Sequence, residues 1–173
     1  LWSRPISEIL AEVGKLVERG FKEIVLTGIC LGAWGRDPYT KALAHGWPGR
    51  RDLGLADILK ALDRIPGEFR VRLSSIEPKY VTDELIDLIA ANKRFCKHLH
   101  IPLQSGDDYI LKSMNRPYTA RDYRLLAEKI RFKLKGAALT TDLLVGFPGE
   151  AEANFKNTLN FIKDILPART HIF

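Results

Sequence analysis

The hydrophobic positions of the chain fall into alternating helical and strand-like patterns. The first apolar set repeats at helical spacing between Ile6 and Val17, and it is bounded by Pro5 and Gly20. A short β-branched run at 23–27 then predicts a strand. The same patterns predict helices at 55–62, from Thr82, at 107–114, from Thr119 and at 151–165, and strands at 69–73, 98–103, 137–145 and 169–173.

This order of elements predicts the fold class. Strands recur at intervals of about 30 residues with helices between them, which is typical of an α/β fold built on a parallel sheet. The 173 residues, 46% of them hydrophobic, suit one domain or a large piece of one. Thr119 and Asp122 form a capping-box-like pair at the start of one helix. The segment Arg36–Asp52 is rich in Pro, Gly and Arg, and it predicts an insertion loop.

The carboxyl ends of the predicted strands carry small residues beside hydrogen-bonding groups. Ligands gather at these ends in parallel α/β folds. Glycines there let a ligand approach the backbone, whereas Glu77 and Gln104 could hold a ribose hydroxyl or an ammonium group. Each group taken singly is better explained by a structural role in a turn, and Glu150 could simply complement the dipole of the next helix. The four ends together predict a binding site, formed by Thr27–Gly35, Ser74–Pro78, Pro102–Asp107 and Gly146–Glu150.

Three further side chains raise the question of a metal. His98 and His100 lie two residues apart on a predicted strand and therefore face the same side, with Asp142 on another strand as a third candidate ligand. The alternative is a polar network inside the fold, and we favour that alternative. Cys30 and Cys96 are too few and too far apart for a metal motif, and they indicate a reducing, cytoplasmic compartment.

Charge and hydropathy narrow the class of partner. The net charge of +6 and the isoelectric point near 9.4 suit a polyanion such as RNA, or equally an enzyme with a basic surface. No apolar run approaches the roughly 20 residues that cross a bilayer, and the start does not resemble a signal peptide. Because the chain does not begin with Met, we expect an internal segment of a longer protein.

Several sequence blocks together resemble the radical S-adenosylmethionine methylthiotransferases. The resemblance spans nearly the whole chain, and it is nearest to the branch that modifies threonylcarbamoyladenosine in tRNA. The sequence departs from the family pattern at the 36–52 segment and at Cys30. We assign no catalytic role to Cys30. The blocks are "SRP", "EIVLTGICLGAWG", "RLSSIEP", "HLHIPLQSGDDYILKSMNRPYT" and "TTDLLVGFPGE".

The resemblance implies a partial (β/α) TIM-like barrel that binds S-adenosylmethionine across the strand ends. Thr27 and Gly28 would meet the methionyl amino group. From its position after the "HIPLQSG" loop, Arg116 is our candidate for a substrate contact, and the alternative is an arginine on a helix surface. Glu77, Gln104 and Ser105 would face the ribose and methionyl part, and residues 146–148 the adenine. The implied cofactor-binding set is Thr27, Gly28, Ser75, Glu77, Gln104, Ser105, Asp142, Gly146, Phe147 and Pro148.

The same resemblance implies partners that these residues do not supply. A Cys-x-x-x-Cys-x-x-Cys motif for a 4Fe–4S cluster would precede "SRP", and flanking domains would carry a second cluster and bind RNA. Residues 1–173 would then form the central core of a longer enzyme that acts on tRNA with proteins donating electrons and sulfur.

Three other interpretations stay open at this point. The first keeps the reaction and replaces tRNA with a ribosomal-protein aspartate. The second is a metal-dependent barrel hydrolase that uses His98, His100 and Asp142. The third is a non-catalytic module that binds S-adenosylmethionine or RNA.

Overall fold

The computed structural model describes residues 2–38 and 53–173. From residue 39 to residue 52, the predicted insertion loop lies outside the described residues. The chain divides into two compact units. One consists of 1–74 and 83–96, and the other of 75–82 and 97–173.

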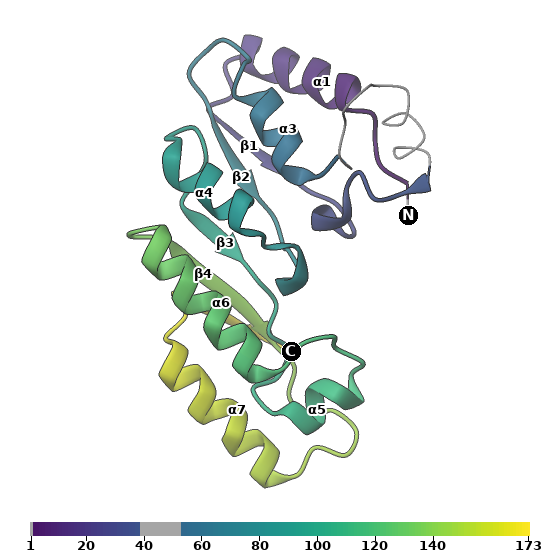
Figure 1. The fold of residues 1–173 in the computed structure, drawn as a ribbon, viewed down its shortest axis with the longest axis vertical. Coiled ribbons are helices and arrows are strands. Elements are labelled where there is room, and N and C mark those ends of the chain that lie inside the picture. Colours follow the sequence, from purple (N-terminus) through teal and green to yellow (C-terminus); the bar gives the residue numbers. More distant parts are fainter. Residues whose placement is uncertain (1, 39–52) are drawn as a thin grey trace. The chain divides into compact units, whose positions relative to one another are not determined.

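The first unit contains a two-stranded parallel sheet with helices packed on it (Figure 1). Ile24 lies opposite Val71 in the register of the two strands, and both side chains are buried. Helix α3 contacts both α1 and α4. The elements are α1 (Ile6–Glu18), β1 (Glu23–Leu26), the 3-10 helix η1 (Leu31–Ala33), α3 (Leu55–Leu62), β2 (Arg70–Leu73) and α4 (Asp83–Ala91).

The second unit contains a three-stranded parallel sheet in the order β3-β4-β5. Leu99 pairs with Leu139, and Thr141 pairs with Thr170. The elements are the 3-10 helix η2 (Pro78–Tyr80), β3 (His98–His100), α5 (Asp108–Ser113), α6 (Ala120–Lys133), β4 (Ala138–Leu143), α7 (Glu152–Ile165) and β5 (Arg169–Ile172).

The helix starts follow the local signals in the sequence. Thr119 Oγ1 accepts a hydrogen bond from the Asp122 N–H at 3.1 Å, and the Asp122 carboxylate accepts one from the Thr119 N–H at 2.9 Å. The predicted capping box of α6 is therefore confirmed. The Asp107 carboxylate caps α5 in the same way by accepting from the Ile110 N–H at 3.1 Å.

Strand β3 is shorter than the predicted 98–103 because a threonine hydroxyl replaces part of the backbone ladder. Thr141 Oγ1 accepts from the Leu103 N–H at 2.9 Å and donates to the Ile101 carbonyl at 2.8 Å. The Tyr123 hydroxyl donates to the same carbonyl at 2.7 Å. Backbone pairing resumes at an isolated bridge between Gln104 and Leu143. The segment after β3 is thus held by buried side chains.

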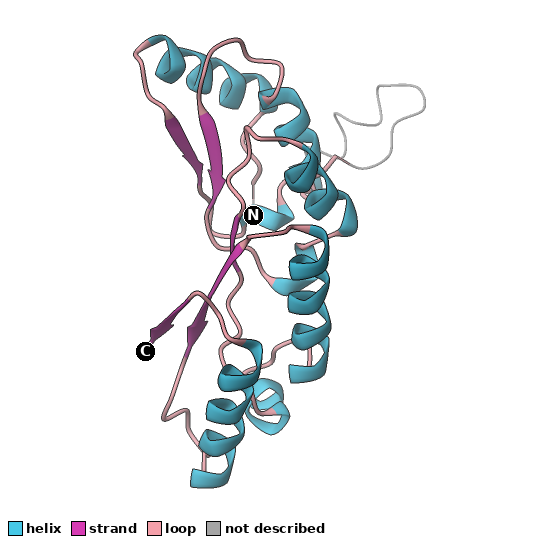
Figure 2. Ribbon diagram, turned by 90° about the vertical axis from the view of Figure 1, so that its left-hand side faces the viewer, coloured by secondary structure: helices cyan, strands magenta, loops and turns pink. Residues whose placement is uncertain are grey.

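In each unit the helices lie on one side of the strands (Figure 2). Side chains alternate between the two faces of a strand, so each sheet has one face turned away from its helices. In the first unit that face carries Glu23 and Arg72, whose Oε1 and Nε atoms lie 2.6 Å apart. The hydrogen bond from Arg72 lowers the pKa of Glu23. Cys96 belongs to this polar group rather than to an apolar core, because its Sγ lies 3.7 Å from a Glu23 oxygen.

The predicted α/β class with parallel strands and outer helices is confirmed. Within residues 2–38 and 53–173, the strands form two parallel sheets and close no barrel. Over the same residues, no helix is long and apolar enough to span a membrane.

Candidate functional site

The carboxyl end of β1 opens into a cavity of about 470 Å³. Thr27 and Gly28 follow the strand directly, are exposed, and line the cavity together with residues of the N-terminal segment and α1. A Cβ on Gly28 would meet Leu31 only at an ordinary distance of 3.5 Å. The fold itself therefore does not require glycine at position 28. Close approach of a ligand to the backbone would explain a glycine there.

Two hydrogen bonds donated by the residues that follow η1 hold one wall of this cavity. The Trp34 indole N–H donates to the Arg4 carbonyl at 2.9 Å, and the Gly35 N–H donates to Ser3 Oγ at 3.0 Å. Cys30 precedes η1 and also lines the cavity. These bonds fix the N-terminal segment beside the end of β1.

In the second unit, Ser75 and Glu77 continue the strand-end pattern. Ser75 is exposed and pairs with His100 at an isolated parallel bridge, and the Ile76 N–H donates to the His100 carbonyl at 3.0 Å. Glu77 is 42% exposed and lies 3.2 Å from the ammonium group of Lys79. Its carboxylate is therefore accessible to a ligand.

Gln104 occupies a left-handed backbone conformation, with φ of 70°. Its N–H donates to the Asp142 carbonyl and its carbonyl accepts from the Leu144 N–H, both at 2.9 Å. The Tyr118 hydroxyl donates to the preceding carbonyl, that of Leu103, at 3.1 Å. Burial raises the pKa of Tyr118 to about 12, so the hydroxyl keeps the proton that it donates. These contacts fix the half-buried Gln104 at the edge of the sheet.

The structure does not support a ligand contact by the Ser105 side chain. Ser105 is fully buried, and its Oγ lies 3.0 Å from Thr158 Oγ1 and accepts from the Asp107 N–H at 3.1 Å. A Cβ on Gly106 would lie 2.6 Å from the Cβ of Phe161. Both residues therefore serve the close approach of this loop to α7, which corrects the interpretation that Gly106 admits a ligand.

Glu150 organises the loop that follows β4. Its Oε2 accepts hydrogen bonds from the N–H groups of Gly146 at 2.5 Å and Phe147 at 3.3 Å. Gly146 has a φ of +72°, and no atom lies within 4 Å of the position that a Cβ would occupy. The carboxylate thus clamps the loop in place, which is a larger role than complementing a helix dipole. The open space beside Gly146 fits the predicted approach of a ligand.

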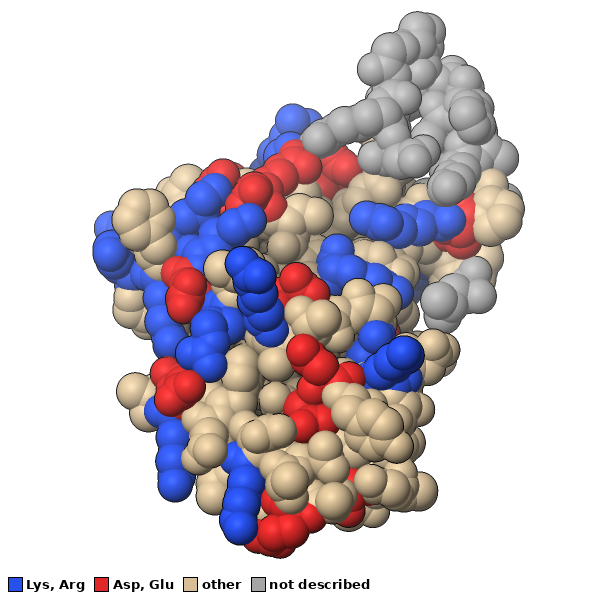
Figure 3. All heavy atoms as spheres, turned by 60° about the horizontal axis from the view of Figure 1, so that its bottom comes forward, with Lys and Arg blue, Asp and Glu red and all other residues tan. Residues whose placement is uncertain are grey.

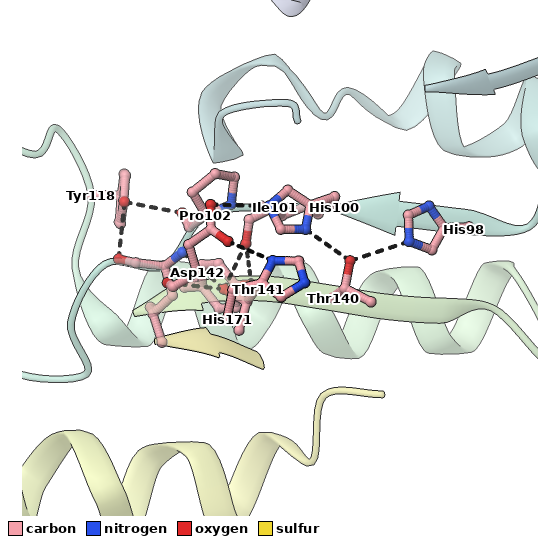
Figure 4. A network of polar contacts seen from close by, with 11 residues as sticks. His98, His100, Ile101, Pro102, Tyr118, Thr140, Thr141, Asp142 and His171 are labelled. Carbon is pink, nitrogen blue, oxygen red and sulfur yellow. Dashed lines mark hydrogen bonds and ion pairs between the residues drawn. The ribbon is translucent and has the colours of Figure 1, made fainter. Parts of the chain in front are cut away.

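Three of the polar side chains on the open face of the second sheet converge (Figure 4). An Asp142 oxygen lies 3.1 Å from His100 Nε2, and the other lies 3.2 Å from His171 Nδ1. His98 instead contacts Thr140, with 3.2 Å between His98 Nε2 and Thr140 Oγ1. The side chains thus form polar contacts, as in the alternative that we favoured, and His171 rather than His98 lies beside His100 and Asp142. Sequence reasoning missed His171, because its position opposite Asp142 depends on the register of β4 and β5.

Arg116 follows α5 in the chain. Its positive charge lowers the pKa of the nearby Tyr118 and so opposes the rise that burial causes. Its Nε makes no hydrogen bond to any residue that the structure describes. The predicted substrate contact by Arg116 stays a prediction. On the face shown in Figure 3, basic and acidic side chains are interspersed, so the positive net charge does not gather there into one patch.

Comparison with known proteins places this chain in a family. Residues 1–162 match the model of the Radical SAM superfamily. The chain is 39% identical, over 99% of its length, to the threonylcarbamoyladenosine tRNA methylthiotransferase MtaB of Thermotoga maritima. It is 37% identical, over 94% of its length, to the tRNA-2-methylthio-N(6)-dimethylallyladenosine synthase of Carboxydothermus hydrogenoformans. The chain spans 36% and 34% of the lengths of these two relatives.

A solved structure supports the fold independently of the sequence. The cobalamin-dependent S-adenosylmethionine radical enzyme OxsB, solved with aqua-cobalamin and S-adenosylmethionine bound, superposes with a TM-score of 0.65. The match covers 91% of this chain and 22% of that one at 13% identity. The family model, the relatives and the fold agree, and the chain belongs to the Radical SAM superfamily.

Proposed function

We propose that this chain is the S-adenosylmethionine-binding core of a tRNA methylthiotransferase acting on threonylcarbamoyladenosine beside the anticodon. The observation that carries the proposal is the similarity, along nearly the whole chain, to a curated enzyme of that name. Because the chain spans about a third of such relatives, the proposal concerns the longer protein of which it would be part.

The accessible strand ends supply the cofactor contacts in this proposal. Thr27 and Gly28 bind the methionyl amino group, and Ser75, Glu77 and Gln104 bind the methionyl and ribose part. The loop Gly146, Phe147 and Pro148 lies against the adenine. Two observations support the assignment of this loop. The space beside Gly146 is unfilled, and the hydrogen bond to the Glu150 carboxylate holds the exposed backbone in a fixed shape. A preformed loop of this kind binds at a lower cost in entropy than a mobile one.

The residues of the chain orient the cofactor and the substrate and shield them from water, whereas the cofactors supply the difficult chemistry. S-adenosylmethionine with a 4Fe–4S cluster would supply radical hydrogen abstraction. Cys30 and Cys96 lack the spacing of a cluster motif, and burial raises the pKa of the Cys96 thiol, which disfavours the thiolate that ligates iron. In this proposal the cluster ligands lie outside the 173 residues. Proteins donating electrons and sulfur would complete the reaction in the cytoplasm.

A second substrate, dimethylallyladenosine in tRNA, has a specific observation in its favour. The chain is 37% identical to a synthase of that modification and 39% identical to the threonylcarbamoyladenosine enzyme, and the difference is too small to separate them. Both substrates are tRNA, with which the net charge of +6 agrees. Arg116 is our candidate for a substrate contact beside the cofactor loops.

A competition between substrates tests the proposal. The intact, cluster-loaded protein would receive S-adenosylmethionine, reductant and a sulfur source. Its substrates would be tRNA with threonylcarbamoyladenosine, tRNA with dimethylallyladenosine, and the ribosomal protein with its target aspartate. We expect mass spectrometry to find the methylthio group on threonylcarbamoyladenosine, and tRNA binding to weaken steeply as salt is raised.

Each other outcome has a defined meaning. Product on dimethylallyladenosine alone would overturn the choice of nucleoside and keep tRNA as the substrate. Product on the ribosomal protein alone would overturn the choice of tRNA. Absence of methylthio product on every substrate would overturn the proposed function.

A further inference from the structure

The polar group on the open face of the second sheet has the composition of a metal site. His100, Asp142 and His171 each present one ligand atom, and these atoms all lie within 4.8 Å of one another. The imidazole rings of His100 and His171 have centroids 5.5 Å apart with Asp142 bonded to both (Figure 4). Two imidazoles and one carboxylate are a ligand set that borderline divalent metals prefer.

The sheet register builds this group from three different strands. His100 pairs with Thr140 across β3 and β4, and Asp142 pairs with His171 across β4 and β5. Thr140 and Asp142 are two residues apart on β4 and so face the same side. Adjacent strands with this register bring the three side chains to one place on the face that the helices leave uncovered.

Hydrogen bonds outside the group are compatible with the tautomer of His100 that binds a metal. His100 Nδ1 lies 2.9 Å from Thr140 Oγ1, and the same Oγ1 lies 3.2 Å from His98 Nε2. One consistent assignment has His100 Nδ1–H donating to Thr140 and the Thr140 hydroxyl donating to His98. In this tautomer His100 Nε2 carries no proton, so its lone pair would bind an ion that replaces the present 3.1 Å contact between Nε2 and the Asp142 carboxylate. Metal-ligating histidines are oriented in this way by a partner on the other ring nitrogen.

Each imidazole already lies near one oxygen of Asp142, and the group, whose ligand atoms lie within 4.8 Å of one another, would contract around an ion. A tetrahedral zinc ion with ligands at about 2.0 to 2.1 Å holds neighbouring ligand atoms roughly 3.3 Å apart. The two separations from Asp142 are 3.1 and 3.2 Å. The side chains of His100 and Asp142 are 12% and 18% exposed, whereas that of His171 is 44% exposed. An ion would therefore enter past His171 and be held against two largely buried ligands.

We propose that His100 Nε2, the Asp142 carboxylate and His171 Nδ1 bind one divalent transition-metal ion, with zinc as the probe. Two neutral imidazoles and one carboxylate leave a net charge of +1 on the bound site. Three protein ligands leave at least one coordination position for water or for an oxygen donor of a bound molecule. Asp142 then acts through the metal instead of touching S-adenosylmethionine directly. The site is separate from the iron–sulfur cluster of the proposed function.

The test is zinc binding by the intact, cluster-loaded protein, measured by elemental analysis and zinc K-edge X-ray absorption. The zinc edge is separate from that of iron, so the clusters do not interfere. We expect a single zinc ion per chain, with nitrogen and oxygen ligands only and the outer scattering of imidazole rings. Asp142→Asn and His171→Phe should each weaken zinc binding at least tenfold, and Thr140→Val about tenfold through the lost partner of His100.

His98→Gln is the matched control, because it removes a histidine that is not a ligand and its amide oxygen can replace His98 Nε2 as the acceptor for Thr140. It should keep the zinc ion and its coordination shell, and circular dichroism should show all four variants folded as the parent is. Zinc–sulfur scattering at about 2.3 Å would place the metal on cysteines and overturn the proposal. Equal zinc binding by the parent and Asp142→Asn, or none by the parent, would reduce the group to a hydrogen-bonded network. Neither of these zinc results would change the methylthiolation assay, which tests the proposed function separately.

Discussion

Replacing Gly106 by alanine is expected to destabilise the protein, whereas the same replacement at Gly14 is expected to stabilise it. A Cβ at Gly106 would lie 2.6 Å from the Cβ of Phe161 and 2.9 Å from the Cα of Thr158. Neither atom is the free end of a side chain, so α7 or its loop must shift. Such overpacking costs about 1 to 3 kcal/mol in unfolding free energy, and we expect the upper part of that range.

Gly14 offers the matched control for this effect. It lies inside α1, and a Cβ there would meet nothing within 4 Å. Alanine should therefore add about 0.5 to 1 kcal/mol by lowering the backbone entropy of the unfolded chain. Urea unfolding of the two variants measures both values. Equal changes of the same sign would contradict the claim that the loop after β3 is packed against α7 without space for a side chain.

Gly146→Ala is expected to weaken S-adenosylmethionine binding about tenfold, equivalent to about 1.4 kcal/mol. The Cβ would enter the open space beside the loop that we assign to the adenine. The replacement also strains the backbone, because φ is +72° and a non-glycine residue there costs about 1 to 2 kcal/mol. A loss of affinity alone would therefore not separate a ligand role from a turn role.

Gly136→Ala separates the two roles. Gly136 has a φ of +75°, it also has open space where a Cβ would lie, and it precedes β4 at the opposite end of the strand from Gly146. Both variants should lose similar stability in thermal unfolding of the intact, cluster-loaded protein. Isothermal titration should show weaker cofactor binding only for Gly146→Ala. Unchanged affinity at Gly146, or equal losses in both variants, would restrict Gly146 to the turn.

The order of helices and strands was predictable because its signals are local. Apolar periodicity locates α1 and α3, and the side chains of Thr119 and Asp122 suffice to start α6. The end of β3 was not predictable in the same way. It depends on the hydroxyl of Thr141, which is 38 residues away from the Leu103 N–H whose hydrogen bond it accepts.

In the candidate site, too, local signals were visible in the sequence whereas tertiary contacts were not. Gly106 and Gly146 give the same signal in the sequence, a glycine just beyond a strand, yet one is packed against α7 and the other faces open space. Only the tertiary neighbours distinguish them. Ser105 likewise looks like a polar strand-end residue, but its hydroxyl is bonded to Thr158. His171 required the register of β4 and β5, which a single sequence does not specify.

The most direct measurement of the central claim is the reductive cleavage of S-adenosylmethionine by the intact protein. The claim is that these strand ends form the cofactor site of a radical enzyme. With its cluster reconstituted and a reductant present, the protein should produce 5′-deoxyadenosine and methionine. Omission of the reductant should abolish both products, and Gly146→Ala should require more cofactor than Gly136→Ala to reach the same rate. A folded, cluster-loaded protein that binds no S-adenosylmethionine and releases no 5′-deoxyadenosine would contradict the account.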